Sequence, residues 1–511
     1  MQTTINPITR QDYPDPDVIR VKDTYYMVST TMHFMPGCVI LRSYDLVHWE
    51  IASYVYDRLE ETNEECLNEA NAYGKGMWAA SIRYHKDTFY VCFVANDTHK
   101  TYLFYSKSVE GPWKRQNIEG FYHDCSLLFD DNRVFIVYGN KEIKLTELNS
   151  KLTAPKIGGL NRTLVNDIGN NMLGYEGSHL YKIHGKYYLF LIHSLKTEWR
   201  RVEACFVSDS LVGEFIGGDV FNDDRGYCNQ GVAQGGIVDT PDGKWYAILF
   251  QDSGAIGRMP ILIPMHFEGD LPVIGINGKV PEMFEIKSTK PEYIYQPLQG
   301  SDDFNWKEKE DGTFEMPKFW QWNHNPDHRY WTMDSKKKAY VITTGKLCEN
   351  VEQSVNTLTQ RMYYPSCEGS VTVDGSQMKN GDYAGICAFQ SCYGIIALTK
   401  QNENYYLVMI ERNPENSGKE LLNKGLQPEQ EVARIKLDTS IVTLKIHAEF
   451  DQMKDTASFY FKENGVWKQF GKEHKLYFLL DHFTGCRFGL FCYATKEIGG
   501  SAAFMKFEYE Y

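Results

Sequence analysis

One pattern recurs five times between residues 17 and 250 of the chain. Each copy is a short apolar strand, a tight polar turn such as Lys22-Asp23 or Asp242-Gly243, and a second strand rich in Tyr, Phe and β-branched residues. This order of residues is typical of a β-hairpin. The copies read DVIRVKDTYYMVST from Asp17, ASIRYHKDTFYVCFV from Ala80, CSLLFDDNRVFIVYG from Cys125, SHLYKIHGKYYLFLI from Ser178 and GGIVDTPDGKWYAILF from Gly235.

A second pair of strands follows each of the first four copies, as in CVILRSYDLVHWE after the first. Two hairpins make a four-stranded blade, and only a short acidic stretch from Arg58 to Asn71 has any helical period. Blades of this kind bury their faces against one another around a central channel. The sequence therefore predicts an all-β chain that begins with a five-bladed β-propeller. The alternative is a β-sandwich whose hairpins resemble one another by coincidence.

The hairpin pattern stops before SDDFNWKEKEDG, a polar and turn-rich stretch that begins at Ser301. Alternating strands follow without a repeat, among them NYYLVMIER and CRFGLFCYA, and Gly, Asn and Asp turns separate them. Such a pattern is typical of a β-sandwich. We therefore predict a propeller at residues 1–300 and a β-sandwich at residues 301–511. The aromatic run from Phe319 to Trp331 is interpreted as packing against the propeller rather than as a sugar-stacking surface.

The composition of the chain indicates which classes of binding partner to expect. The chain has 54 Lys and Arg against 67 Asp and Glu, so its net charge is −13 and no basic run offers a surface for nucleic acid. No stretch approaches the roughly 20 apolar residues of a membrane span. The twelve cysteines lack metal-ligand spacing, and most lie in apolar strands, as buried reduced thiols do. We predict a soluble, cytoplasmic protein with no nucleic-acid or membrane partner, and a homo-oligomer remains open.

Three carboxylates stand where the innermost strands of a propeller begin. Asp15, Asp124 and Glu176 directly precede apolar strands in three different copies, and such strand heads converge on the channel. Carboxylates held close together raise one another's pKa, so that one can act as a general acid while another acts as a base. Two carboxyl groups flanking a sugar bond are what glycoside hydrolysis requires. The alternative for each residue alone is a turn cap. For Asp17, an ion pair with Arg20 or a role in the turn is preferred to catalysis.

Several longer segments occur together in the order typical of one enzyme family. They include YPDPDVIRVKD, MWAASIRYH, HDCSLLFDD, YEGSHLYKIHGKYYLF and QGGIVDTPDGKWYAILFQDSGAIGR, and later QWNHNP, NTLTQR, GDYAG and YATK. In these segments the chain is similar to glycoside hydrolase family 43, whose members are inverting exo-enzymes that act on arabinose and xylose linkages. It resembles the members that carry a C-terminal, concanavalin-like β-sandwich.

The resemblance implies a role for each of the three carboxylates. Asp15 would be the general base that activates water, and Glu176 the general acid that protonates the leaving oxygen. Asp124 would tune the pKa of that acid and orient it. Inversion implies that the carboxyl groups of Asp15 and Glu176 stand about 6.5–9.5 Å apart, with room for water between them.

The resemblance also implies contacts with the sugar. Phe34 and Trp78 would form apolar walls of the subsite, with core packing as the alternative. Arg258 resembles an arginine that hydrogen-bonds sugar hydroxyls, and the alternative is a surface salt bridge. Gln234 is also predicted to bind the substrate. A loop of the sandwich would close one side of the pocket, which favours exo action on short oligomers.

Blade five departs from the family at one position. Relatives usually carry a channel-facing histidine, often tied to a bound metal, where this chain has Ala233. Alanine ligates no metal, so we predict no metal ligand and no required cofactor, and a bound calcium is disfavoured. The alternative is a calcium ion whose shell is completed by water around Gln234 and nearby carbonyl oxygens. The strand-head histidines His123 and His179 are interpreted as structural.

These observations predict an exo-acting β-D-xylosidase with α-L-arabinofuranosidase activity. It would release non-reducing-end pentoses from xylo-oligosaccharides or arabinoxylo-oligosaccharides by inversion. Two alternatives are an α-L-arabinofuranosidase with little xylosidase activity and a propeller that binds glycans without cutting them.

Overall fold

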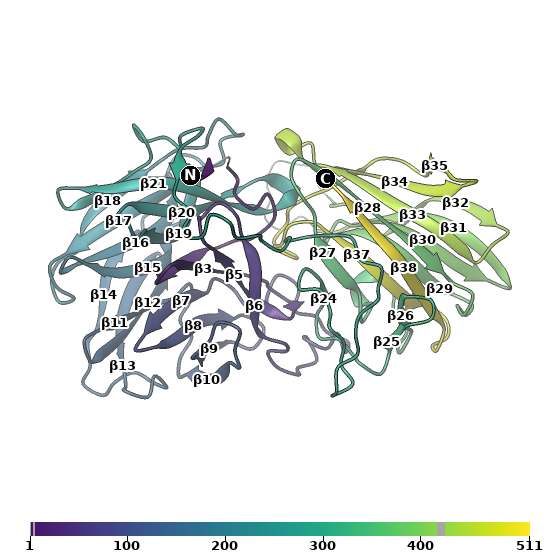
Figure 1. Cartoon of the computed structure of the whole chain (residues 1–511), viewed down its shortest axis with the longest axis horizontal. Coiled ribbons are helices and arrows are strands. Elements are labelled where there is room, and N and C mark those ends of the chain that lie inside the picture. The colour runs from purple at the N-terminus through teal and green to yellow at the C-terminus, as the bar shows by residue number, and fades with distance from the viewer. Residues whose placement is uncertain (1, 4–5, 416–424) are drawn as a thin grey trace.

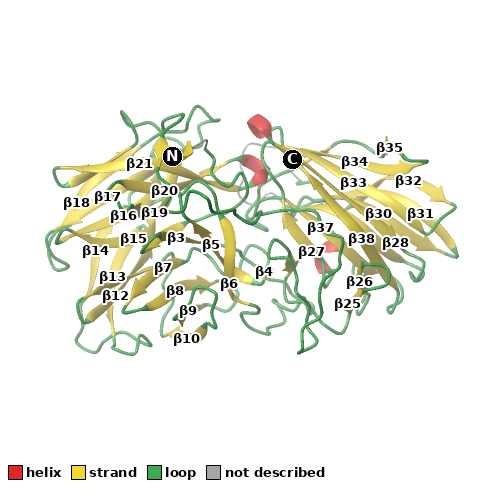
Figure 2. Cartoon of the chain, viewed as in Figure 1, coloured by secondary structure: helices red, strands yellow, loops and turns green. Residues whose placement is uncertain are grey.

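The computed structural model describes residues 2–3, 6–415 and 425–511, and strands dominate it (Figures 1 and 2). Five four-stranded antiparallel sheets form one end of the molecule and two larger sheets form the other (Figure 1). Within the described residues, the helices are three short 3-10 turns, η1 (Gly254–Ile256), η2 (Val351–Gln353) and η3 (Asp451–Met453). In the described part of the chain, none of them has the length and apolarity to cross a bilayer.

Each of the five small sheets is one blade, and its strands follow one another in chain order. Blade one is β2 (Asp17–Val21), β3 (Thr24–Ser29), β5 (Gly37–Ser43) and β6 (Glu50–Tyr56); blade two is β7 (Ser81–His85), β8 (Thr88–Ala95), β9 (Lys100–Ser106) and β10 (Lys114–Ile118). Blade three is β11 (Ser126–Asp130), β12 (Arg133–Asn140), β13 (Glu142–Leu148) and β14 (Asn161–Asn166); blade four is β15 (Glu176–Ile183), β16 (Lys186–Ser194), β17 (Arg201–Ser208) and β18 (Ile216–Phe221). Blade five is β19 (Val232–Asp239), β20 (Trp245–Asp252), β21 (Arg258–Glu268) and β22 (Leu271–Ile274).

The innermost strands close a ring. Strand β2 contacts β7, β7 contacts β11, β11 contacts β15, β15 contacts β19, and β19 returns to β2. The short strand β1 (Gln2–Thr3) pairs with β23 (Glu285–Ile286), which follows the last blade. The predicted five-bladed propeller is therefore confirmed, and the fifth repeat also has the second hairpin that the sequence pattern did not reveal.

The geometry of the hairpin turns explains why the repeat can be recognised in the sequence. Lys86 and Asp87 both have positive φ, as do His184 and Gly185, and two such residues in succession form the turn whose twist matches a β-hairpin. Each inter-blade space then holds its own apolar core, for example Phe135 and Leu189 between blades three and four. Burying one large apolar side chain contributes about 1.5–3 kcal/mol, so the recurring Tyr and Phe residues stabilise blade packing.

The second region is a sandwich of two sheets around one core. One sheet has the order β32-β31-β30-β29-β37-β27-β24-β4, and the other has the order β25-β26-β38-β28-β33-β34-β35, with β36 paired to β34. The strands of the first sheet are β4 (Phe34–Met35), β24 (Gln321–Asn323), β27 (Leu358–Arg361), β29 (Asp382–Phe389), β30 (Gly394–Gln401), β31 (Asn404–Glu411), β32 (Gln430–Leu437) and β37 (Arg487–Ala494). Those of the second are β25 (Trp331–Asp334), β26 (Ala339–Thr343), β28 (Ser366–Asp374), β33 (Ile441–Glu449), β34 (Thr456–Glu463), β35 (Val466–Gln469), β36 (His474–Lys475) and β38 (Ser501–Glu510).

Strand β4 joins the two regions, because it leaves blade one and pairs with β24 at the edge of a sandwich sheet. The segment after blade five stays on the propeller, where Thr289 and Gln296 donate backbone hydrogen bonds to Tyr44 and Glu50. Asp302 then bridges Phe507 in β38. The predicted bounds 1–300 and 301–511 stay a prediction, since β4 gives the sandwich a strand from the first 300 residues.

Candidate active site

The backbone is distorted where the three predicted carboxylates and Gln234 lie. Asp15 and Asp124 have φ values of 52° and 47°, which aspartate tolerates better than most residues. Strand β15 has an irregular register just after Glu176, at Gly177, and β19 has one at Gln234. Bulges of this kind bend a strand and re-aim side chains, and they are frequent next to active sites.

Asp15 lies in a buried ion pair. Nη1 of Arg258 stands 2.8 Å from its Oδ1, and the Thr30 hydroxyl donates to its Oδ2 at 2.7 Å. The side chains of Asp15 and Arg258 are 7% and 4% exposed, so solvent screens this pair little. Nε and Nη2 of Arg258 are buried donors that have no partner. The alternative for Arg258, a surface salt bridge, is thus wrong, because its ion pair is buried and joins it to a predicted catalytic residue.

Asp124 and Glu176 share a third neighbour, His123. Its Nε2 lies 3.8 Å from Oδ1 of Asp124 and 3.7 Å from Oε2 of Glu176, and Asn140 donates to the same Oε2 at 2.5 Å. Burial raises the pKa of Asp124 to about 7, and the charges of Glu176 and Asp15 add to this while His123 opposes it. The Asp124 and Glu176 carboxylates raise the pKa of His123 to about 9 against the effect of its burial.

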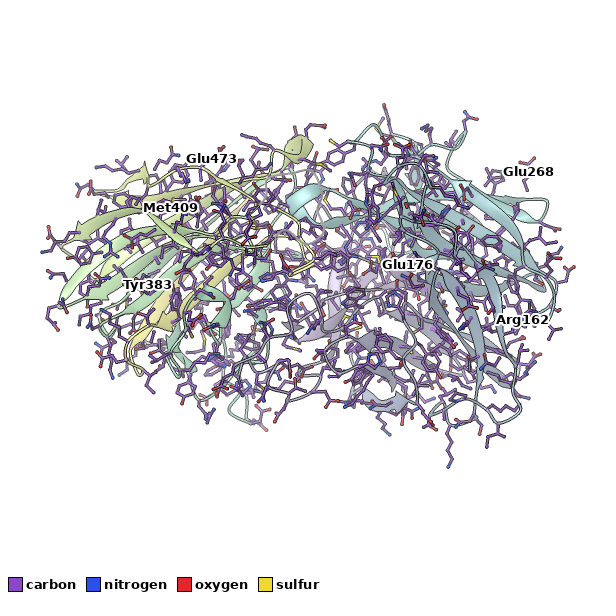
Figure 3. All side chains as sticks on the ribbon, turned by 180° about the vertical axis from the view of Figure 1, so that it is seen from behind. Arg162, Glu176, Glu268, Tyr383, Met409 and Glu473 are labelled. Atoms are coloured by element: carbon purple, nitrogen blue, oxygen red, sulfur yellow. The ribbon has the colours of Figure 1, made fainter. Side chains whose placement is uncertain are left out.

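The site faces the sandwich, and Figure 3 shows Glu176 on that side of the propeller. Phe483 reaches it from the loop before β37: its ring centroid lies 4.4 Å from the Arg258 guanidinium and 5.5 Å from that of Trp78. Trp78 is half-buried, its ring lies 5.8 Å from His123, and its indole Nε1 has no partner. The structure thereby identifies the sandwich loop that the sequence could not.

Gln234 and Phe34, both predicted to contact the substrate, lie in different surroundings. The Gln234 side chain lies beside the backbone that follows Glu176, since a Cβ on Gly177 would come within 2.8 Å of its Cδ. Phe34 is not brought to this group: it is fully buried in β4, packs with sandwich residues, and has the Arg487 guanidinium 3.5 Å from its ring centroid. A side chain without exposed surface packs the domains together, so Phe483 stands where an apolar wall beside Trp78 was expected.

Arg201, at the start of β17, is not among the site residues predicted from the sequence. It pairs with Asp252, and its side chain is 13% exposed. Burial and the neighbouring Arg258 lower its pKa to about 10, while Glu176 and Asp15 oppose that shift, which places it beside the carboxylates. Its position in a blade's third strand carries no sequence signal, because only the strand heads were aligned by the repeat.

The predicted pair of Asp17 with Arg20 is wrong. Arg20 pairs with Asp239, whereas Asp17 pairs with Arg83 at 2.5 Å and lies 3.2 Å from Nδ1 of His179. Residues three apart on a strand point to opposite faces, so Asp17 and Arg20 could not meet. Burial opposes ionisation of Asp17, but Arg83 and His179 outweigh it and lower its pKa to about 2. His179 is thus a structural histidine, as expected.

One group in the described part of the chain has metal-like spacing, namely His123, Asp124 and Glu176, whose ligand atoms lie within 4.8 Å of one another. Calcium takes six to eight oxygen ligands, and this group offers two carboxylates and a nitrogen. Ala233 is fully buried and adds no ligand. These residues do not fit a calcium ion.

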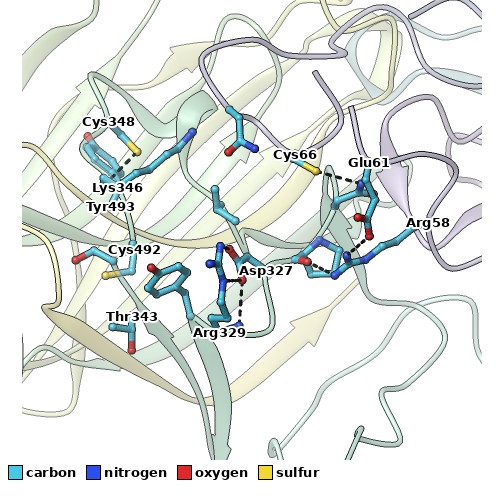
Figure 4. A pocket seen from close by; sticks show the side chains of 17 residues that line it. Arg58, Glu61, Cys66, Asp327, Arg329, Thr343, Lys346, Cys348, Cys492 and Tyr493 are labelled. Carbon is cyan, nitrogen blue, oxygen red and sulfur yellow. Dashed lines mark hydrogen bonds and ion pairs between the residues drawn. The ribbon is translucent and has the colours of Figure 1, made fainter. Parts of the chain in front are cut away.

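A separate cavity of about 360 Å³ lies at the seam between the propeller and the sandwich (Figure 4). The ion pairs Arg58–Glu61 and Arg329–Asp327 line it, together with Lys346 and Tyr493. None of the predicted site residues lines this cavity. The seam cavity is therefore distinct from the carboxylate group.

Sequence profiles match both regions. Residues 4–272, just over half of the chain, match glycosyl hydrolases family 43, and residues 311–510 match the concanavalin A-like C-terminal domain of beta-xylosidases. The second match confirms the concanavalin-like character of the sandwich. The first covers every predicted site residue.

Individual relatives agree with these profiles. A beta-xylosidase of Formosa agariphila is 25% identical over all of this chain and 90% of its own length, and a non-reducing-end alpha-L-arabinofuranosidase of Bacteroides ovatus is 24% identical over 81% and 77%. Among solved structures, a bifunctional GH43-CE protein of Bacteroides eggerthii has a TM-score of 0.90 and 39% identity over the whole of this chain. This chain spans 64% of that protein. A GH43 enzyme engineered for endo-xylanase and exo-arabinofuranosidase activity has a TM-score of 0.86 and 26% identity, with 99% of each chain covered.

Proposed function

We propose that this chain, which belongs to glycosyl hydrolase family 43, releases single xylose and arabinose units from the non-reducing ends of xylo-oligosaccharides and arabinoxylo-oligosaccharides. It is a glycoside hydrolase of an inverting family. The observation that carries the proposal is the joint placement of Asp15 on Arg258 and of Asp124 and Glu176 around His123, in three blades.

The proposed reaction is a single displacement. Asp15 takes a proton from a water molecule, the water oxygen bonds to the anomeric carbon, and Glu176 gives its proton to the departing glycosidic oxygen. Asp124 lies close to Glu176 and is poorly solvated, and in the proposed reaction it orients this acid. Asn140 fixes the carboxyl group of Glu176 through Oε2.

The surroundings of the carboxylates support a pentose substrate. Trp78 and Phe483 offer apolar faces to a sugar ring, while Nε and Nη2 of Arg258 and Nε1 of Trp78 are donors without protein partners. Buried donors left unpaired are costly, so sugar hydroxyls that accept from them would be bound selectively. Phe483 comes from the sandwich and narrows one side of the site, which supports exo action.

We further propose that the reaction needs no cofactor and that the protein is cytoplasmic. The first proposal rests on the poor fit of the donor atoms of His123, Asp124 and Glu176 to calcium. The second rests on the twelve cysteines, none of which is in a disulfide and most of which are buried.

The decisive experiment compares the wild type with Asp15→Asn and Glu176→Gln on xylobiose and on nitrophenyl β-D-xylopyranoside and α-L-arabinofuranoside. We expect xylose release from xylobiose, with the α-anomer first in the NMR spectrum, and a large loss in both variants. A ratio of kcat/KM that strongly favours the arabinofuranoside would replace the proposal by an arabinofuranosidase, as in the Bacteroides ovatus relative. Binding of xylobiose without turnover would replace it by a glycan-binding propeller.

A further inference from the structure

His123 differs from the other charged residues of the site in its distance to the carboxylates. In the residues that the structure describes, its imidazole is the one basic group within ion-pair distance of either Asp124 or Glu176. It belongs to blade three, whereas Glu176 begins the inner strand of blade four. The carbonyl oxygen of His123 accepts a hydrogen bond from Gly139 at 3.0 Å, so its backbone is tied to the neighbouring strand.

The two sides of the site carry cations of different chemistry. Asp15 is paired with Arg258, and a guanidinium does not lose its proton in a protein. Glu176 is paired with an imidazole, which exchanges protons in the neutral range. The acid side of the site therefore has the cation that can deliver a proton.

The proposed reaction requires that Glu176 regain a proton before the next turnover. After each single displacement, Asp15 holds the proton taken from water and Glu176 has lost its own. We propose that His123 is a positioning residue that returns a proton to Glu176 after each turnover, an inference that rests on the proposed function. Nε2–H of His123 gives its proton to Oε2 of Glu176, the neutral ring regains a proton from solvent water, and Asp15 releases one to solvent, so protons balance over the cycle.

Three observations support this route. The His123 side chain is 23% exposed, so its ring has access to water, while Asp124 beside it is 7% exposed. The 3.7 Å between Nε2 and Oε2 needs to shorten by less than about 1 Å, as catalytic contacts commonly do when substrate binds. The ring faces Asp124, Glu176 and the Cys125 thiol, and the two carboxylates raise its pKa to about 9, so it carries a proton at neutral pH.

The test compares leaving groups in the intact protein. Xylobiose needs protonation of its departing oxygen, whereas dinitrophenyl β-D-xyloside does not. We expect His123→Gln to lower kcat on xylobiose about 10–100-fold and to change kcat on the dinitrophenyl xyloside less than about threefold. Imidazole added to His123→Ala should restore about tenfold of the activity on xylobiose. His85→Gln, which removes a histidine stacked on Phe129 in blade two, is the matched control and should behave as wild type.

Three results would overturn the inference: wild-type kcat of His123→Gln on xylobiose, an equal loss on both substrates, or no rescue of a folded His123→Ala by imidazole. The glutamine variant keeps a polar side chain of similar size, so it tests the proton route if the alanine variant fails to fold. A wild-type protein that cleaves neither substrate would instead refute the proposed function itself.

Discussion

Asp124→Asn replaces a buried carboxyl group by an amide of nearly the same shape, and it should stabilise the fold while weakening catalysis. Burial and the charges of Glu176 and Asp15 raise the pKa of Asp124 from 3.8 to about 7. Between these two values the unfolded chain has lost the proton that the folded chain retains. The free energy of unfolding therefore falls by about 1.36 kcal/mol per pH unit, and above pH 7 a cost of about 4 kcal/mol remains.

The asparagine variant has no such titration, so its advantage over the wild type should grow with pH. The two units from pH 5 to 7 make that advantage about 3 kcal/mol larger at pH 8 than at pH 5. The pKa of about 7 for Asp124 already includes the opposing effect of His123, so the attraction between the two side chains is not added separately. At about 2.1 cal/mol/K per residue, the 511 residues have an unfolding entropy of about 1.1 kcal/mol/K, so the gap in Tm between the variant and the wild type should widen by about 3 °C.

Scanning calorimetry at pH 5 and pH 8, with kcat on xylobiose measured in parallel, checks both halves of this prediction. We expect kcat to fall about 100-fold, as when a general acid is mistuned. Asp131→Asn, at the exposed turn of the same hairpin, is the control and should show the same Tm difference from wild type at both pH values. An Asp124→Asn advantage that is equal at the two pH values, or negative at pH 8, would refute the assigned cost of the buried carboxylate.

Other perturbations test separate parts of the site. Glu176→Gln should lose about 10²–10⁴-fold in kcat on xylobiose but keep most activity on dinitrophenyl xyloside, and Asp15→Asn should lose activity on both; equal behaviour of the two variants would contradict their assigned roles. Phe483→Ala should raise KM about tenfold or more with an unchanged Tm, because it removes an apolar wall of about 1.5–3 kcal/mol; unchanged KM would exclude it from the subsite. Gly177→Ala should lower both Tm and kcat, since its φ of 65° and the Gln234 side chain 2.8 Å away leave no place for a Cβ. Chelation with EDTA should leave kcat unchanged, and a loss restored by calcium would show that the site binds a metal.

The repeat made the propeller and its three carboxylates predictable from sequence. Aligned hairpins place their strand heads in one register, so Asp15, Asp124 and Glu176 could be collected without any knowledge of distance. The repeat aligns only residues within it, which is why Arg201, at the start of a third strand, was missed.

Contacts between the two regions had no comparable signal. Phe483 and Trp78 meet across some 400 positions of sequence, and no local pattern connects a sandwich loop with a blade. The two alternatives for Phe34 could not be separated for the same reason, because the sequence around an aromatic residue near a strand head does not show whether it faces a sugar or a neighbouring domain. The family resemblance stated that some sandwich loop closes the pocket, but only the fold identifies that loop.

The pairing of β4 with β24 constrains how the chain can fold during synthesis. Residues 34–35 emerge from the ribosome almost 300 residues before residues 321–323, their partners in the sheet. At about 5–20 residues per second, this edge of blade one waits roughly 15–60 s with its backbone groups and Phe34 uncovered. An open edge is a template for pairing with other chains, so a nascent propeller is most exposed to aggregation in this interval. The sandwich, translated last, ends this exposure when β24 pairs with β4.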